Sequence, residues 1–401
     1  MLEARELLAG TAGSKELGRR RMIVEIMVKP DRQSRLARRL GVSQATVSTL
    51  IKELAESGIV EGDSARPSSG GVRLRPTRGV AVGIDLGFNH VTVIARRVDE
   101  PYDRLVSRTS DNGANRGLDR LLPEIQQMVS DAVAETGQHL DGIVSAGVAV
   151  PRMINPRDER FTTPILPPWT SDDQPARALS KLLKVQHVAI DNDANLGAMA
   201  EQTYGLEDPV ETVVYIKAST GIGAGITIGS TLVRGLRGMA GEIGHLTLRR
   251  DGDACMCGGR GCLDTIAGAE ALLAQVRQAY RGNAFDTPTT LKSLVEKALA
   301  GDAVCVRVLN DAGRALGFAL AQLCNLINPN LIVLGGELAN GKHLVIDTCG
   351  QQLRRYALSG AVGELDGFVL RTTALGQLAE AHGALILGLR SRQLDASGNG
   401  E

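Results

Sequence analysis

Three of the six cysteines in this 401-residue chain stand within eight residues of one another, and no other feature restricts its fold as strongly. They form the pattern Cys255-x-Cys257-x4-Cys262, and His245 precedes the first of them by ten residues. Three thiolates and one imidazole are the ligands of a closed tetrahedral zinc site, and the glycines after Cys257 permit a short loop around a metal. The alternative is three free thiols beside an unrelated histidine. The sequence predicts a structural zinc ion bound by His245, Cys255, Cys257 and Cys262.

Length and composition predict more than one hydrophobic core. The chain is 43% hydrophobic, and single cores stop growing at about 250–300 residues, so at least two domains are expected. Charged residues interrupt the first ten positions, and no apolar run approaches the roughly 18 residues of a membrane span. Cys305, Cys324 and Cys349 are isolated and are interpreted as packing residues. We therefore expect a cytoplasmic chain in a reducing compartment, without a membrane partner.

The charge is divided unevenly along the chain, although its total is zero. Residues 1–78 hold 15 Lys and Arg against 9 Asp and Glu, which leaves +6, and the other residues hold 30 against 36, which leaves −6. A basic segment is suited to contact with the phosphates of nucleic acid. The N-terminal segment is therefore the candidate for such a partner.

The same segment carries the pattern of a winged helix-turn-helix. One helix is expected over Arg19–Val28, a second from the cap Ser34 to Leu40, and a third from the cap Ser43, with Gly41 supplying the left-handed turn. Strands at residues 58–61 and 72–75 would form the wing. The alternative is a small helical module for oligomerisation.

The third helix has one apolar face and one face of short polar side chains. Donors and acceptors of this kind can reach base edges and phosphates in the major groove. The candidate DNA-binding residues are Gln44, Thr46, Ser48, Thr49 and Lys52, together with Arg66 in the wing loop.

The rest of the chain alternates apolar strands with helical stretches, which predicts an α/β fold of two lobes with a cleft between them. The expected strands are residues 80–87, 91–95, 142–150, 188–191, 212–218, 225–228 and 331–335. The expected organisation is a DNA-binding domain over 1–78 and a two-lobed domain over 79–391. The lobes would comprise about 79–190 plus the C-terminal helix, and about 191–375. Residues 1–14 and 392–401, rich in small and polar residues, are expected to be flexible.

Three glycine-bearing turns follow strands. Glycine lets the backbone approach a phosphate and direct its N–H groups at it, although it also makes ordinary tight turns. The candidate nucleotide-binding residues are Asp85 and Gly87 in the first turn, Thr220, Gly221 and Gly223 in the second, which runs from Ser219 to Gly225, and Gly335 and Gly336 in the third.

The run Asp191-Asn192-Asp193-Ala194-Asn195 ends a strand and opens a helix. A carboxylate there can accept a proton from a bound hydroxyl, and the amide of Asn192 can both donate to a hydroxyl and accept from one. Asp193 is equally consistent with a helix cap.

These motifs together resemble the ROK family of repressors, open reading frames and sugar kinases. The resemblance rests on Gly241-Glu242-Ile243-Gly244-His245, on Cys255-Met256-Cys257-Gly258-Gly259-Arg260-Gly261-Cys262 and on residues 191–195, and it covers nearly the whole chain. The N-terminal extension is similar to the repressor branch, the NagC/XylR type.

The resemblance implies a two-lobed, actin-like ATPase (ribonuclease-H-like) fold with a sugar held between the lobes. It implies that Asp193 stands at the catalytic-base position, and that His245 uses one ring nitrogen for a hydroxyl and the other for zinc, which would fix its orientation. The implied sugar-binding residues are Asn192, Asp193, Glu242, His245 and Asp264.

Two departures from the family pattern concern catalysis and specificity. Family kinases usually carry Asp-x-Gly-Gly-Thr-Lys in the first phosphate turn, where this chain has Asp85-Leu86-Gly87-Phe88-Asn89-His90. Binding of ATP and Mg²⁺ is therefore not expected. Asp264 replaces a usual glutamate after Gly-Cys-Leu, which shortens that side chain by one methylene.

The leading hypothesis is a sugar-responsive regulator of carbohydrate metabolism, a repressor that binds near-palindromic operator DNA as a homodimer or homotetramer. Its effector would be a sugar or sugar phosphate. One alternative is an ATP-dependent, glucokinase-like sugar kinase that retains a DNA-binding domain, with Asp193 as catalytic base. Another is a regulator with a vestigial cleft that answers to a protein partner or to none.

Overall fold

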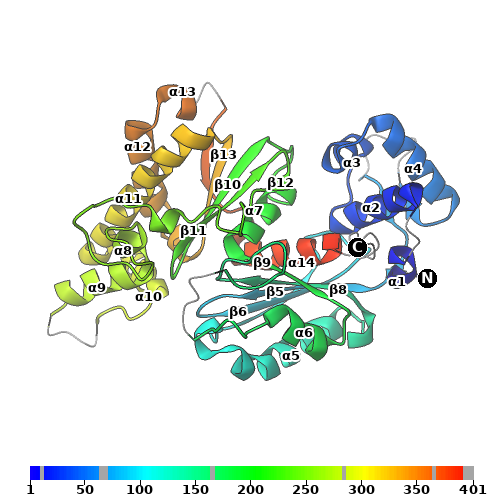
Figure 1. The fold of residues 1–401 in the computed structure, drawn as a ribbon, viewed down its shortest axis with the longest axis horizontal. Coiled ribbons are helices and arrows are strands. Elements are labelled where there is room, and N and C mark those ends of the chain that lie inside the picture. Colours follow the sequence, from blue (N-terminus) through cyan, green and yellow to red (C-terminus); the bar gives the residue numbers. More distant parts are fainter. Residues whose placement is uncertain (10–12, 63–70, 163–167, 282–285, 364–366, 392–401) are drawn as a thin grey trace.

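The computed structural model describes residues 1–9, 13–62, 71–162, 168–281, 286–363 and 367–391 (Figure 1). Its N-terminal part is a winged helix-turn-helix, as predicted. Three helices, α2 (Ser14–Val28), α3 (Gln33–Leu40) and α4 (Gln44–Glu56), precede the antiparallel pair of β2 (Val60–Glu61) and β3 (Arg73–Leu74). The tip of the wing, with Arg66, lies outside the described residues.

Local sequence explains the turn between α3 and α4. Gly41 has a φ of 66°, the left-handed conformation that glycine adopts without strain, and it ends α3. The Ser43 hydroxyl accepts a bond from the Thr46 N–H at 3.1 Å and caps α4, as predicted. The cap expected at Ser34 is wrong. Helix α3 already begins at Gln33 after Arg32, whose backbone is extended and makes no side-chain cap.

The remainder consists of two lobes whose five-stranded sheets have the same strand order, which confirms the α/β prediction. The first sheet is ordered β7-β6-β5-β8-β9 and the second β12-β11-β10-β13-β14. In each sheet the first three strands are antiparallel and the last three parallel. The first sheet contains β5 (Val80–Leu86), β6 (Val91–Arg97), β7 (Val106–Ser110), β8 (Ile143–Val150) and β9 (Val188–Asn192). The second contains β10 (Thr212–Ala218), β11 (Ile222–Ile228), β12 (Thr231–Leu232), β13 (Leu331–Gly335) and β14 (Val369–Thr372).

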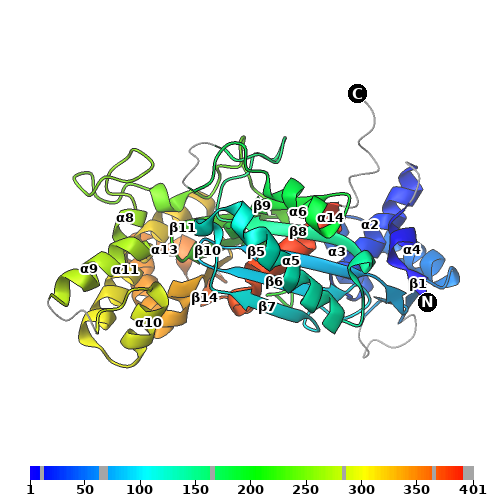
Figure 2. The same cartoon turned by 90° about the horizontal axis from the view of Figure 1, so that it is seen from below.

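Two helices, α7 (Asp193–Thr203) and α14 (Ala379–Ser391), lie between the lobes and pack against each other. Helix α7 packs on β10 and β11 of the second sheet, and α14 packs on β5 and β8 of the first. The opposite face of the first sheet is covered by α5 (Leu118–Glu135) and α6 (Pro175–Leu183), which stand in front of that sheet in Figure 2. The second lobe is completed by α8 (Asp264–Ala267), α9 (Ala269–Ala279), α10 (Leu291–Leu299), α11 (Ala303–Ile327), α12 (His343–Tyr356) and α13 (Ser359–Val362).

Three expectations about local structure are corrected. The second glycine turn is shorter than expected, because β11 begins at Ile222 and Gly223 therefore lies in a strand. Edge strands β7, β12 and β14 were missed, because strands of this kind lack a continuous apolar run. The N-terminus is ordered rather than flexible over its first nine residues. Leu2–Glu3 forms β1, which pairs with β4 (Thr77–Arg78), and α1 (Ala4–Leu8) buries Ala4 and Leu8.

One hydrophobic core joins the winged helix to the lobes. It runs from α2, α3 and α4 through Tyr204 and α7 to α14, with Met22, Leu54, Leu196 and Leu385 among its buried members. The winged helix is therefore packed directly on the interlobe helices α7 and α14. Among the described residues, no helix combines the length and apolar character needed to cross a membrane.

Candidate functional site

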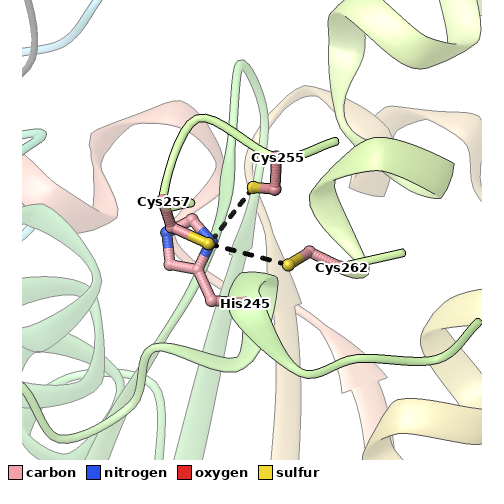
Figure 3. A group of neighbouring side chains, drawn as sticks. All are labelled: His245, Cys255, Cys257 and Cys262. Carbon is pink, nitrogen blue, oxygen red and sulfur yellow. Dashed lines mark hydrogen bonds between the residues drawn. The ribbon is translucent and has the colours of Figure 1, made fainter. Parts of the chain in front are cut away.

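The three clustered cysteines and His245 come together in one group, as Figure 3 shows, and their ligand atoms all lie within 4.8 Å of one another. The Sγ of Cys255 lies 3.6 Å from Nδ1 of His245, and the Sγ atoms of Cys257 and Cys262 are 3.7 Å apart. A tetrahedral metal with bonds of about 2.3 Å to sulfur requires ligand separations of about 3.8 Å. The four residues therefore have the donor set and spacing for a metal ion.

The cysteine loop is shaped by glycines and by backbone bonds. Gly261 has a φ of 60°, and a Cβ there would lie 1.6 Å from the carbonyl oxygen of Arg249. The N–H of Gly259 donates to the Cys257 Sγ at 3.4 Å and lowers the pKa of that thiol, which favours the thiolate that binds metal. The alternation of Leu246 and Leu248 predicts a strand after His245, but this prediction is wrong, because the segment forms only a bridge between Thr247 and Cys262.

The residues implied as sugar-binding converge beside this loop. Asn192 caps α7 and Asp193 begins it, Glu242 precedes a short 3-10 helix that contains His245, and Asp264 begins α8. The Nε2 of His245 faces Glu242 at 4.0 Å, while its Nδ1 faces the thiols. Burial, together with the charges of Asp193 and Asp264, raises the pKa of Glu242 to about 7. Three carboxylates and an imidazole thus line one site, a set suited to sugar hydroxyls.

Asp264 is held by the first residue of β11, directly after the second glycine turn. Its Oδ1 accepts a bond from the Ile222 N–H at 2.8 Å, and a Cβ at Gly244 would lie 2.8 Å from the same oxygen. The shorter aspartate therefore fits against the backbone of the turn and of the 3-10 helix.

Lys217, near the end of β10, contacts Asp193 of this group and was not among the residues predicted from the sequence. Its Nζ lies 3.0 Å from Asp193, 3.5 Å from Glu380 and 3.9 Å from Asp85. Burial lowers the pKa of Lys217, but these carboxylates outweigh burial and raise the pKa above its ordinary value. The carboxylate of Asp193 is thus already paired with a lysine. A lone lysine in the apolar strand at residues 212–218 was the available signal.

The first glycine turn is covered by its own side chains. The Nε2 of His90 bonds Asp85 at 2.8 Å, and a Cβ at Gly87 would lie 2.2 Å from the His90 ring. Burial lowers the pKa of His90, but Asp85 outweighs burial and raises the pKa. Asn89 donates to the Thr220 hydroxyl at 3.3 Å, so the first two turns contact each other directly. The His90 ring therefore fills the space beside the Gly87 backbone that a phosphate would need.

The third turn has structural reasons for its glycines. A Cβ at Gly335 would lie 2.0 Å from the Tyr215 hydroxyl. Gly336 has a φ of 77°, which disfavours other residues.

All five candidate base-reading residues of α4 are exposed, whereas Val47, Ile51 and Leu54 on the same helix are buried. The polar face is Gln44, Thr46, Ser48, Thr49 and Lys52. Lys52 has a loose ion pair with Glu56 at 4.0 Å. The face that sequence periodicity assigned to DNA is therefore open to solvent.

The comparisons with known proteins agree with this architecture. Residues 81–391 match the ROK family profile, and residues 32–61 match a winged helix-turn-helix DNA-binding profile. The xylose repressor of Bacillus subtilis (strain 168) is 25% identical over 382 residues, which cover 92% of this chain and 94% of the relative. The DNA-binding transcriptional dual regulator NagC of Escherichia coli (strain K12) is 26% identical over 387 residues, which cover 91% and 92%.

A solved structure extends the likeness to the arrangement of the parts. It is a ROK family transcriptional regulator, described as a homolog of the E. coli MLC protein, and it superposes with a TM-score of 0.72 at 21% identity. The match covers 95% of this chain and 97% of the other. On the match of more than half its length to the family profile, the chain belongs to the ROK family, with a winged helix-turn-helix at its N-terminus.

Proposed function

We propose that this protein is a sugar-responsive transcriptional repressor that acts in the cytoplasm on operator DNA. The observation that carries the proposal is the core shared by the DNA-binding helices and the interlobe helices α7 and α14. A ligand that favours one arrangement of the lobes can, through this core, favour one arrangement of the DNA-binding part. Its differential affinity for the two arrangements limits the change in DNA affinity.

The effector site in this proposal is the cleft lined by Asn192, Asp193, Glu242, His245 and Asp264, whose oxygens and nitrogens would bind sugar hydroxyls. A structural zinc ion would be held by His245, Cys255, Cys257 and Cys262, and it would orient His245 toward the sugar. Relatives of this chain carry the names xylose repressor and N-acetylglucosamine repressor, which makes D-xylose and N-acetylglucosamine the first sugars to test.

A homodimer, alone or within a homotetramer, is the proposed DNA-binding form. Two-fold symmetry would place two copies of α4 in successive major-groove turns, about 34 Å apart, on a near-palindromic site.

Capture of genomic DNA fragments by the purified protein tests the proposal, repeated with D-xylose, N-acetylglucosamine, D-glucose and their 6- or 5-phosphates. The expected result is one recurrent palindrome whose capture changes with one sugar. If no DNA sequence is enriched under any condition, the proposal that the protein is a transcriptional regulator is contradicted. If the protein binds an operator and no sugar changes this binding, a regulator that responds to a protein partner, or to no effector, is favoured.

A sugar kinase is the second candidate, favoured by the carboxylate of Asp193 in the cleft. His90 over Gly87 and the pairing of Lys217 with Asp193 oppose it. A kinase would release ADP in a sugar-dependent manner, and Asp193→Asn would abolish the release. We expect no sugar-dependent ADP release from either protein.

A further inference from the structure

Helix α7 joins the proposed sugar site to the DNA-binding part without any intervening element. Its cap Asn192 and its first residue Asp193 belong to the proposed sugar site, and the carbonyl of its last residue, Thr203, accepts a bond from Lys29 at the end of α2. Eleven residues of α-helix span about 16 Å. A ligand bound at the N-terminal end of α7 therefore contacts a helix whose C-terminal end contacts the winged helix.

The contact at the far end is reciprocal. The Tyr204 hydroxyl donates to the carbonyl of Val28, the last residue of α2, at 2.8 Å. In return, Nζ of Lys29 donates to the carbonyls of Thr203 at 2.8 Å and of Leu206 at 3.3 Å. Helix C-termini leave carbonyls without intrahelical partners, and cations there are favoured by the helix dipole. The end of each helix thus supplies a hydrogen-bond donor to a backbone carbonyl at the end of the other helix.

Ring contacts fix the position of this joint. Tyr204 stacks on Tyr102 with centroids 4.5 Å apart and meets the edge of His382 at 5.2 Å. Lys29 stands over the Tyr102 ring at 5.6 Å. Tyr204 is 5% exposed, so its side chain has no room to turn into solvent when α7 is displaced. A displacement of α7 therefore moves the residues that Tyr204 contacts.

Helix α7 is itself held too closely to bend. All of its residues are buried. A Cβ at Gly197 would lie 2.3 Å from the Tyr215 ring, and a Cβ at Gly383 of α14 would lie 2.0 Å from the Leu196 carbonyl oxygen. Close-packed interiors transmit displacement because they have little free volume. Movement at Asn192 is therefore passed along the axis of α7 instead of being lost within it.

We propose that the joint of Tyr204 and Lys29 with the ends of α2 and α7 carries the allosteric signal from the sugar site to the DNA-binding helices. This inference rests on the proposed function and specifies its route. Sugar binding at Asn192 and Asp193 shifts α7, and the joint transfers the shift to the end of α2, from which the chain continues into α3. Tyr204 and Lys29 are coupling residues that contact neither ligand.

Coupling is measured as the ratio of operator Kd with and without the active sugar of the panel. Wild type is expected to show a ratio of about 5–150-fold. Tyr204→Phe removes one hydroxyl and keeps the ring, and Lys29→Met keeps the chain length without the charge. Each variant is expected to bring the ratio at least about threefold closer to one, with the sugar Kd within about twofold of wild type when no DNA is present. Tyr280→Phe is the matched control, because its hydroxyl bonds Asp302 in the second lobe.

Full coupling in the Tyr204→Phe, Lys29→Met double variant would overturn the inference. If no sugar changes operator binding by wild type, the proposed function fails. The route through α7 and the joint is then tested separately, by amide hydrogen exchange. Asn192→Ala, which removes the cap of α7, is expected to speed amide exchange at residues 24–29 at least about threefold. In the Tyr204→Phe background this effect should vanish. Equal acceleration in both backgrounds, or none in either, would overturn the route through α7.

Discussion

At the residue scale, the histidine in the cysteine cluster has two faces with different tasks. Its Nδ1 lies toward the thiols and its Nε2 toward Glu242. A metal on the first face would fix the second for hydroxyl binding, because a ligating ring cannot rotate freely. Loss of the metal should therefore affect ligand binding as well as stability.

Cys257→Ser is expected to remove the bound metal and to lower the Tm by at least about 5 °C, because metal binding contributes directly to folding free energy. Metal analysis of the purified protein and thermal unfolding check both effects. Cys324→Ala, a buried cysteine far along the chain from the cluster, is the control and should retain the metal. Equal metal content in Cys257→Ser and wild type would contradict the site.

His382 gives the joint between the parts a dependence on pH. Burial, together with the nearby Arg96 charge, lowers its pKa from 6.5 to about 4. The folded protein thus keeps this ring neutral, while the unfolded chain protonates it below pH 6.5. The histidine's contribution is fully present above pH 6.5 and is lost as the pH falls toward 4, by about 1.4 kcal/mol per pH unit.

Denaturant unfolding of wild type and His382→Asn across this pH range measures the difference. The stability advantage of wild type over the variant should shrink with that slope on acidification. His139→Asn, which alters an exposed histidine, should keep the wild-type slope. Parallel curves for wild type and His382→Asn would show that the ring does not titrate as inferred.

At the element scale, α4 separates packing from recognition along one helix. Val47, Ile51 and Leu54 hold it in the core, so changes on its polar face should leave the fold intact. The 3.6-residue period makes this separation readable from the sequence.

Lys52→Ala is expected to weaken operator binding and to reduce the slope of log Kd against log salt by about one, because one phosphate contact is lost. Fluorescence anisotropy on the captured operator over a salt series gives both values. Lys181→Ala, at an exposed lysine of α6 in the first lobe, should change neither. An unchanged slope for Lys52→Ala would place the DNA interface on another surface.

At the scale of the whole molecule, the winged helix and the first lobe should unfold together. Arg390 of α14 makes two bonds to Glu25 of α2, at 2.8 and 3.1 Å, and Glu25 is 4% exposed. Burial raises the pKa of Glu25, but Arg390 outweighs burial and lowers the pKa, so the carboxylate stays charged. This ion pair adds a polar contact between α2 and α14 to the apolar contacts of the shared core.

Arg390→Met is expected to destabilise the protein by about 2–4 kcal/mol, because it removes both hydrogen bonds of the buried Glu25 carboxylate and leaves it only the longer ion pair with Arg39, at 4.0 Å. Calorimetry should show a lower Tm and, at the limit, a separate transition for the winged helix. Arg314→Met removes an exposed pair with Asp311 and should shift the Tm by less than about 1 °C. A Tm for Arg390→Met equal to that of the control would contradict a coupled interface.

The sequence by itself determined the local and periodic features. Gly41 and Ser43 specify the turn and cap of the helix-turn-helix through their own backbone and hydroxyl. The spacing of Cys255, Cys257 and Cys262 brings three thiols into one loop before any tertiary contact forms. Buried strands such as β5 and β10 were readable because they are continuous apolar runs, whereas the edge strands were not.

Only the tertiary structure decided which distant residues meet. Lys217, Asp85 and Glu380 lie far apart in the chain and converge because two sheets of equal topology face the same pair of helices. The bond from the Tyr204 hydroxyl to the Val28 carbonyl spans 176 residues and has no sequence signature, because its acceptor is a backbone carbonyl, which every residue carries. Periodicity reports which face of an element is buried, but the partner of that face is fixed by the packing of the whole chain.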